Sequence, residues 1–68
     1  MLKKLGENVR RIRKNKNFPM DKLALKLNMS RKTLSYIENA KGNPTIKSLR
    51  TISIGLGVRV SDFFKDIK

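Results

Sequence analysis

The stretch that decides the fold is residues 20–39, which read MDKLALKLNMSRKTLSYIEN. Apolar residues recur every three or four positions on both sides of its centre: Met20, Leu23, Ala24 and Leu27, then Leu34 and Ile37. This spacing predicts two short helices, each with one apolar face. Asn28 tolerates the left-handed conformation that closes a helix, and Ser30 is a good N-cap for the next one. We therefore predict two helices that cross steeply across a three-residue turn, with the small Ala24 where their axes approach.

Three further helices are expected around this pair. Their inner faces are Leu2, Leu5, Val9 and Ile12 in the first helix, Leu49, Ile52, Ser53 and Leu56 in the fourth, and Phe63 and Phe64 in the last. Phe18-Pro19 breaks the chain after the first helix, and Thr45 and Ser61 are the expected caps of the last two. No segment alternates with period two for long enough to form a strand. Residues 1–68 are predicted to be one all-α, five-helix domain.

Charge is the strongest feature of the composition. The chain carries 17 Lys and Arg against 5 Asp and Glu, a formal net charge of +12. Solubility of a small domain needs a net charge of only about 2 to 8. A field of this size concentrates polyanions around the protein. It favours nucleic acid as the partner, with an anionic membrane surface as the alternative.

Other features of the composition exclude whole classes of function. The chain has no Cys and no His, and its 5 acids are scattered. We therefore expect no metal, no cofactor and no enzymatic acid-base pair. A membrane-surface protein needs Trp or Phe on broad amphipathic faces, whereas this chain has no Trp and its apolar stripes are narrow. No apolar run is long enough for a signal peptide or a membrane span, so a cytoplasmic protein is expected.

The chain resembles the Cro and phage-repressor type of helix-turn-helix protein, also called the xenobiotic-response-element family. The matching stretches are Leu5–Arg13, Leu23–Leu27, Met29–Glu38, Pro44-Thr45 with Leu49 and Ile52, and Leu56–Val58. The resemblance covers nearly the whole chain, from about residue 5 to residue 64. It implies a compact lambda-repressor-like domain whose second and third helices, about residues 20–39, form the helix-turn-helix.

The resemblance also implies a function. Members regulate transcription, often as repressors, by binding duplex DNA as homodimers on two-fold symmetric operators. The small size fits a restriction-modification controller, a prophage-type repressor or an antitoxin-like regulator, and all three stay open at this point. No residues remain for an effector pocket, so no small-molecule ligand is expected.

DNA contacts are expected on the outward face of the second helix of the motif and in the loop after it. The candidates for reading base edges in the major groove are Arg31, Lys32, Ser35 and Tyr36. The candidates for contacting backbone phosphates are Asn39, Lys41, Asn43, Thr45 and Lys47.

Two structural features follow from the resemblance. It implies a partly buried ion pair between Arg13 and Glu38. This pair joins the first helix to the second helix of the motif, which is called the reading helix below because it is expected to read the bases. The family favours glycine after the reading helix, where this chain has Ala40. A left-handed Ala40 costs about 1 to 2 kcal/mol, so we expect the loop to close differently, with Gly42 as the candidate.

A homodimer interface is expected in the C-terminal third. One reading helix is too short to specify a genomic site, and a two-fold dimer doubles it. The apolar residues left over after the core is filled are Ile54, Val60, Phe64 and Ile67. In the alternative, Phe64 and Ile67 only cover the end of the first helix.

Overall fold

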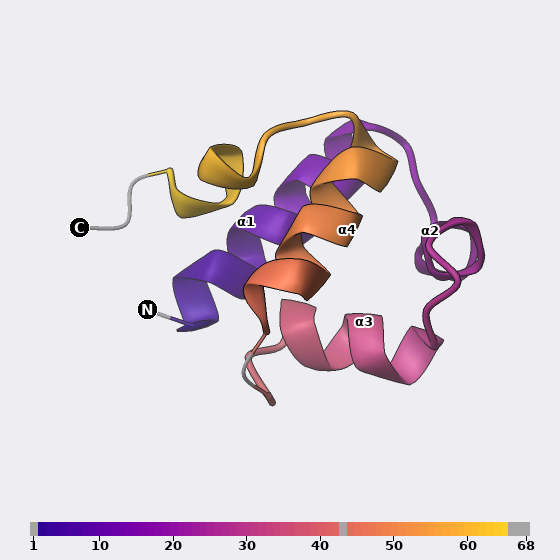
Figure 1. Cartoon of the computed structure of the whole chain (residues 1–68), viewed down its shortest axis with the longest axis horizontal. Coiled ribbons are helices and arrows are strands. Elements are labelled where there is room, and N and C mark those ends of the chain that lie inside the picture. Colours follow the sequence, from indigo (N-terminus) through magenta and orange to yellow (C-terminus); the bar gives the residue numbers. More distant parts are fainter. Residues whose placement is uncertain (1, 43, 66–68) are drawn as a thin grey trace.

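The computed structural model describes residues 2–42 and 44–65, and of residue 2 only the backbone. Its elements are α1 (Leu2–Asn15), α2 (Met20–Lys26), α3 (Arg31–Glu38), α4 (Ile46–Leu56) and the short 3-10 helix η1 (Val60–Phe64) (Figure 1). The described part of the chain contains no strand, so the all-α prediction is confirmed.

The last predicted helix differs from the expectation. Residues 60–64 form a single short 3-10 helix, so the count of five α-helices is not confirmed. Ser61 does not cap it, because the helix begins one residue earlier. The backbone N–H of Arg59 instead donates to Asp62 Oδ2 at 2.9 Å.

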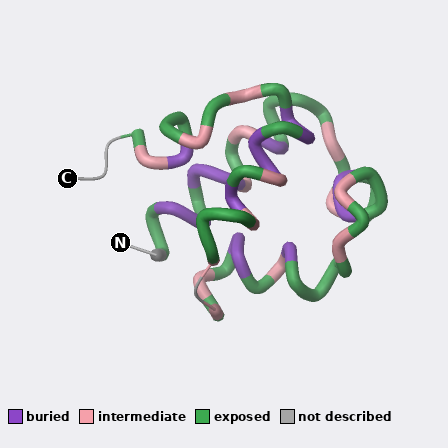
Figure 2. The backbone as a smooth tube through the Cα atoms, viewed as in Figure 1, coloured by how far each residue is buried: buried purple, intermediate pink, exposed green. Residues whose placement is uncertain are grey.

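The core lies between α1, α3 and α4, and is closed by α2 and η1. Its buried apolar residues are Leu5, Val9, Leu23, Ala24, Leu34, Ile37, Leu49, Ile52, Leu56 and Phe63. Figure 2 shows the buried positions turned inward on each helix. Every predicted inner-face residue of α4 is buried, because their spacing places them on one side of the helix.

Gly6 sets how closely α1 approaches α3. A Cβ atom at this position would lie 2.5 Å from the carbonyl oxygen of Glu38 and 2.6 Å from that of Ile37. Any side chain would therefore push the two helices apart. This close approach brings α1 against the C-terminal end of α3.

The corner between α2 and α3 forms as the sequence predicts. Asn28 has a φ of 53°, and the backbone N–H of Met29 donates to the carbonyl of Ala24 at 2.9 Å. The Ser30 side chain accepts from the backbone N–H of Thr33 at 3.0 Å, which satisfies a free donor at the start of α3. These bonds fix the direction in which α3 leaves the corner.

The loop after α3 closes at Ala40, which has a φ of 58°. The expectation that it closes differently was therefore wrong. Two backbone bonds hold this conformation, from Ala40 N–H to the Ile37 carbonyl at 3.4 Å and from Lys41 N–H to the Tyr36 carbonyl at 2.9 Å. They satisfy carbonyls at the end of α3 and outweigh the strain of a left-handed alanine.

Candidate nucleic-acid interface

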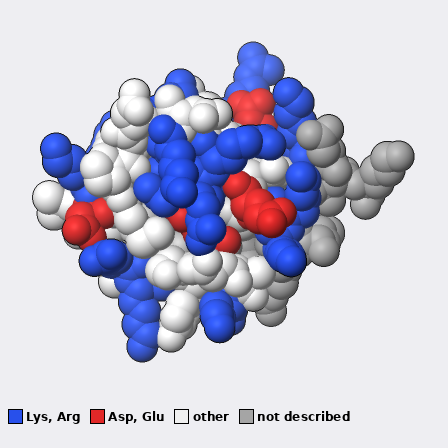
Figure 3. Space-filling view, turned by 180° about the vertical axis from the view of Figure 1, so that it is seen from behind, with Lys and Arg blue, Asp and Glu red and all other residues white. Residues whose placement is uncertain are grey.

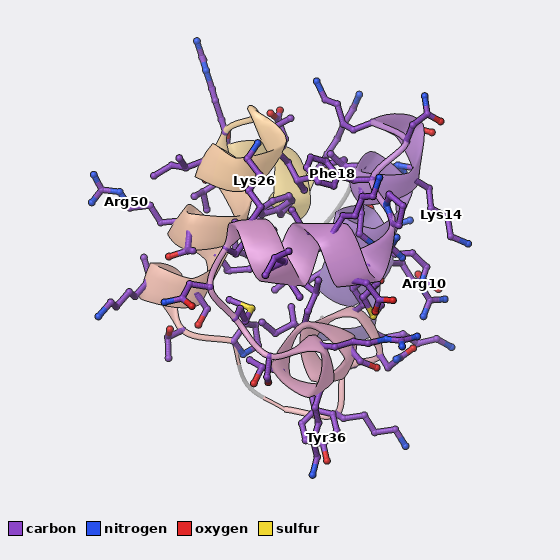
Figure 4. All side chains as sticks on the ribbon, turned by 90° about the vertical axis from the view of Figure 1, so that its right-hand side faces the viewer. Arg10, Lys14, Phe18, Lys26, Tyr36 and Arg50 are labelled. Carbon is purple, nitrogen blue, oxygen red and sulfur yellow. The ribbon has the colours of Figure 1, made fainter. Side chains whose placement is uncertain are left out.

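The outward face of α3 is the centre of the candidate interface. Leu34, Ile37 and Glu38 are buried on its inner side. Lys32 and Tyr36 lie on the opposite side, and Tyr36 points away from the body of the molecule (Figure 4). Lys32 Nζ lies 5.5 Å from the centre of the Tyr36 ring, one helical turn away, in a cation–π contact. The two side chains thus form one exposed, cationic ridge.

Arg31 lies at the N-terminal end of α3, where it meets an acid that the sequence did not point to. Its Nε is 3.1 Å from Asp21 Oδ1 in the first turn of α2, and both side chains are about 70% exposed. An exposed pair of this kind contributes at most about 1 kcal/mol. The guanidinium can therefore exchange the carboxylate for a nucleic-acid acceptor at little cost.

Ser35 and Asn39 are joined in a small network with Arg10 of α1. Arg10 Nη2 donates to Asn39 Oδ1 at 2.5 Å. The amide nitrogen of Asn39 donates to the Ser35 carbonyl at 3.0 Å and to its hydroxyl at 3.1 Å. The Asn39 side chain is thus already bonded within the protein, whereas the sequence placed it among the phosphate contacts. The sequence did not single out Arg10, because only the crossing of α1 and α3 brings it here.

A buried ion pair lies directly behind this face. Arg13 Nε donates to Glu38 Oε2 at 2.7 Å and Arg13 Nη2 donates to Oε1 at 3.1 Å. The Glu38 side chain is fully buried and that of Arg13 is 9% exposed. Arg13 Nη1 also donates to the carbonyl of Phe18 at 2.8 Å. The Arg13 guanidinium therefore connects α1 both to α3 and to the loop before α2.

The loop and the start of α4 border the other side of α3. Lys41, Thr45 and Lys47 are exposed there, and Asn43 lies outside the described residues. The Thr45 hydroxyl caps α4 by accepting from the Ser48 backbone N–H at 3.0 Å. The exposed ammonium groups of Lys41 and Lys47 thus lie next to α3, in the loop and helix start where phosphate contacts were expected.

Cations also cover the outer side of α1. The exposed or half-exposed ones are Lys3, Lys4, Arg10, Arg11 and Lys14. Figure 3 shows Lys and Arg side chains spread over the face seen from behind, among uncharged groups and a few acids. The positive charge is therefore not confined to α3 but extends over α1 as well, which attracts a polyanion to a broad surface.

The predicted dimer residues differ in exposure. Ile54 of α4 is 70% exposed, whereas Val60 and Phe64 are half-buried against the core. Ile67 lies outside the described residues. Leu25 of α2, which the sequence did not single out, is 82% exposed. The free apolar surface is therefore centred on α4 and α2 more than on η1.

No group of three or more acids, Cys or His that could hold a metal ion occurs in residues 2–42 and 44–65. No helix in this part of the chain is long and apolar enough to cross a membrane.

Comparison with known proteins identifies relatives over most of the chain. The control protein C.MunI of Mycoplasma sp is 33% identical over 66 residues, which cover 96% of this chain and 89% of that protein. The immunity repressor protein of Bacillus phage phi105 is 35% identical over 57 residues, 84% of this chain and 40% of the repressor.

Solved structures agree with these relatives. The wild-type restriction-modification controller protein C.Esp1396I is 39% identical, with a TM-score of 0.83 over 94% of this chain and 83% of that one. The controller protein C.AhdI from Aeromonas hydrophila has a TM-score of 0.89 over 93% of this chain and 96% of that one. At 21% sequence identity, this similarity indicates a shared fold and nothing more. A family profile described as helix-turn-helix matches residues 9–63. The chain belongs to this helix-turn-helix family.

Proposed function

We propose that this chain regulates transcription by binding a specific duplex DNA sequence as a homodimer. The observation that carries the proposal is the exposed cationic face of α3, held by a buried ion pair behind it. An α-helix fits into the major groove of DNA, where each base pair presents a distinct pattern of hydrogen-bond donors and acceptors. Membership of the helix-turn-helix family supports the same role.

In this proposal, α3 reads bases with Arg31, Lys32, Ser35 and Tyr36. Lys32 is exposed on the outer side of α3 and can donate to guanine O6 and N7. Arg31 can make the more rigid bidentate contact to guanine once it leaves Asp21. Tyr36 offers a ring edge to a thymine methyl group and a hydroxyl to a phosphate.

The phosphate contacts fix the register of α3 in the groove. Lys41 and Lys47 supply exposed positive charges in the loop and at the start of α4, and Thr45 lies between them in the sequence. Asn43 belongs to the same loop by sequence. Such contacts hold the protein on any duplex and carry no sequence information of their own. Base selection is therefore assigned to α3, and the non-specific part of the affinity to the loop and α4.

The dimer interface is proposed to centre on Ile54, with Val60, Phe64 and Ile67 at its edge. Ile54 is 70% exposed on α4, and Val60 and Phe64 are only partly buried against the core, so the C-terminal third carries apolar surface that a second copy of the chain could cover. In such a dimer, the two reading helices must lie about 34 Å apart, one turn of duplex, to enter successive major grooves.

Among regulators of this family, a restriction-modification controller is the best-supported type. The chain is 33% identical to the control protein C.MunI over 89% of that protein. It is also 39% identical to the controller C.Esp1396I. A role as a binding protein without catalysis agrees with the exposed, acid-poor face of α3.

Selection from a random duplex library tests this proposal. We expect enrichment of a two-fold symmetric sequence with half-sites about 10 base pairs apart. Binding should weaken steeply as salt rises from about 50 to 200 mM. Titration with anionic vesicles is the control for the cationic membrane-surface alternative. Tight vesicle binding without enrichment of any duplex would overturn the proposal.

Sedimentation tests the assembly separately. Wild type should be a dimer at micromolar concentration, and Ile54→Lys should be a folded monomer. Leu25→Lys is the matched control, because it places the same charge on another exposed apolar position. A monomeric wild type, or a dimer lost only in Leu25→Lys, would move the interface away from α4.

A further inference from the structure

We infer that Arg10 determines which hydrogen-bonding group Ser35 presents to DNA, acting through Asn39. The inference rests on the proposed function, since it concerns how α3 reads bases. Arg10 belongs to α1, and Asn39 is the first residue after α3. Arg10 is thus a positioning residue on a helix that does not itself enter the groove.

The first step is the orientation of the Asn39 side-chain amide. A guanidinium has five donors and no acceptor, so only the amide oxygen can face it. Arg10 Nη2 lies 2.5 Å from Asn39 Oδ1. The amide nitrogen must then point the other way, where it lies 3.0 Å from the Ser35 carbonyl and 3.1 Å from the Ser35 hydroxyl. Without Arg10, the amide oxygen loses the donor that holds it, and the Asn39 side chain can swing away from Ser35 toward water, which leaves the hydroxyl without its partner.

The second step is what holds Arg10 in place. Its Nε lies 3.5 Å from Glu38 Oε1, and the Glu38 side chain is fully buried. The same carboxylate is bound at 2.7 Å by Arg13, so its position is fixed from the core side. Arg10 is the outer cation of this cluster, with a side chain that is 42% exposed. Arg10 is therefore held through its Nε by the buried Glu38 carboxylate, whereas its Nη2 faces Asn39.

The third step concerns the polarity of Ser35. A hydroxyl has one hydrogen and two lone pairs, and either can be used toward a base. Ser35 Oγ accepts from Asn39, and within residues 2–42 and 44–65 no acceptor is recorded for its hydrogen. That hydrogen is therefore free to donate outward. Ser35 should favour base edges that accept, such as guanine O6 or thymine O4, over the amino groups of cytosine and adenine.

Base preferences of a set of variants test this inference. Ser35→Ala first identifies the base pair that the hydroxyl reads. Arg10→Met keeps the length of the side chain and removes its donors, so it should lose about 2- to 12-fold discrimination at that same base pair. Arg10→Lys keeps a donor and should retain most of the preference. Arg11→Met is the matched control, since it removes the same charge from the next, exposed residue of α1.

Each outcome separates the possible failures. If wild type enriches no duplex, the proposed function fails and this inference with it. If wild type binds specifically but Arg10→Met keeps the preference at the Ser35 base pair, only this inference fails. A uniform loss of affinity, with a salt slope about 0.9 smaller than that of Arg11→Met, would make Arg10 a direct phosphate contact and also overturn it. Asn39→Ala leaves the Glu38 cluster intact and must reproduce the loss of preference, which keeps the test valid if Arg10→Met folds poorly.

Discussion

Arg13→Met should lower the free energy of unfolding by about 3 to 5 kcal/mol, which is the usual cost of removing one partner from a buried ion pair. The variant keeps the apolar stem of the side chain but leaves the fully buried Glu38 carboxylate without its contacts at 2.7 and 3.1 Å. Among residues 2–42 and 44–65, Arg10 is then the one remaining ion-pair partner of Glu38, at 3.5 Å. The carbonyl of Phe18 also loses a donor at 2.8 Å. The carboxylate would then be buried with too few donors.

The size of this loss is large for so small a domain. A chain of 68 residues has a total stability of about 3 to 10 kcal/mol at the usual value per residue. Removing about 3 to 5 kcal/mol would unfold a domain at the lower end of this range and would leave one at the upper end with about 5 to 7 kcal/mol. Where a transition is still measurable, Tm should fall by at least about 12 °C.

Urea unfolding followed by circular dichroism measures the effect. The matched control is Arg31→Met, which makes the same chemical change in the exposed pair with Asp21 and should cost no more than about 1 kcal/mol. The double variant Arg13→Met, Glu38→Leu should recover much of the loss, because no charge is then buried unpaired. Equal destabilisation by Arg13→Met and Arg31→Met would refute the reasoning that burial gives the inner pair its importance.

Three further predictions concern local features. Gly6→Ala should lower the free energy of unfolding by about 1 to 3 kcal/mol, as measured with urea, since its Cβ would lie 2.5 Å from the Glu38 carbonyl oxygen. Gly42→Ala is the control, because a Cβ there would meet nothing within 4 Å. Equal effects of the two variants would contradict the close approach of α1 and α3. Ala40→Gly should raise stability by up to about 1 kcal/mol because it relieves a φ of 58°, and a loss would show that the left-handed alanine is unstrained. Asp21→Asn should strengthen binding to random duplex about fivefold or less, as measured by fluorescence titration, because a unit charge about 4 Å away in water is worth about 1 kcal/mol; weaker binding would argue that the acid orders Arg31 for DNA.

The features predicted correctly from sequence are those set by local chemistry. Ser30 and Thr45 cap their helices because a side-chain oxygen satisfies N–H donors that any helix start leaves free. Asn28 turns left-handed because few other residues do so at low cost. The buried face of α4 follows from the helical repeat alone. Each of these depends on residues within a turn or two of each other.

The features missed from sequence depend on how helices cross. The pairing of Asp21 with Arg31 and the bond from Arg10 to Asn39 join elements whose relative position is set by packing. The left-handed conformation of Ala40 was missed because the prediction considered the residue type and not the hydrogen bonds of the loop. Backbone hydrogen bonds at the end of α3 outweigh a local strain that the residue type alone suggests will be avoided.

The central claim is that α3 selects bases while the loop and α4 hold the backbone. The most direct measurement compares the base preference of Lys32→Ala and Lys47→Ala on the duplex that wild type selects. Lys32→Ala should lose about 1 to 3 kcal/mol of discrimination at one base pair in each half-site. Lys47→Ala should weaken all duplexes equally and lower the salt slope by about 1. Equal weakening of all sequences by Lys32→Ala, or a loss of affinity for the selected duplex alone in Lys47→Ala, would contradict this division of roles between α3 and the loop with α4.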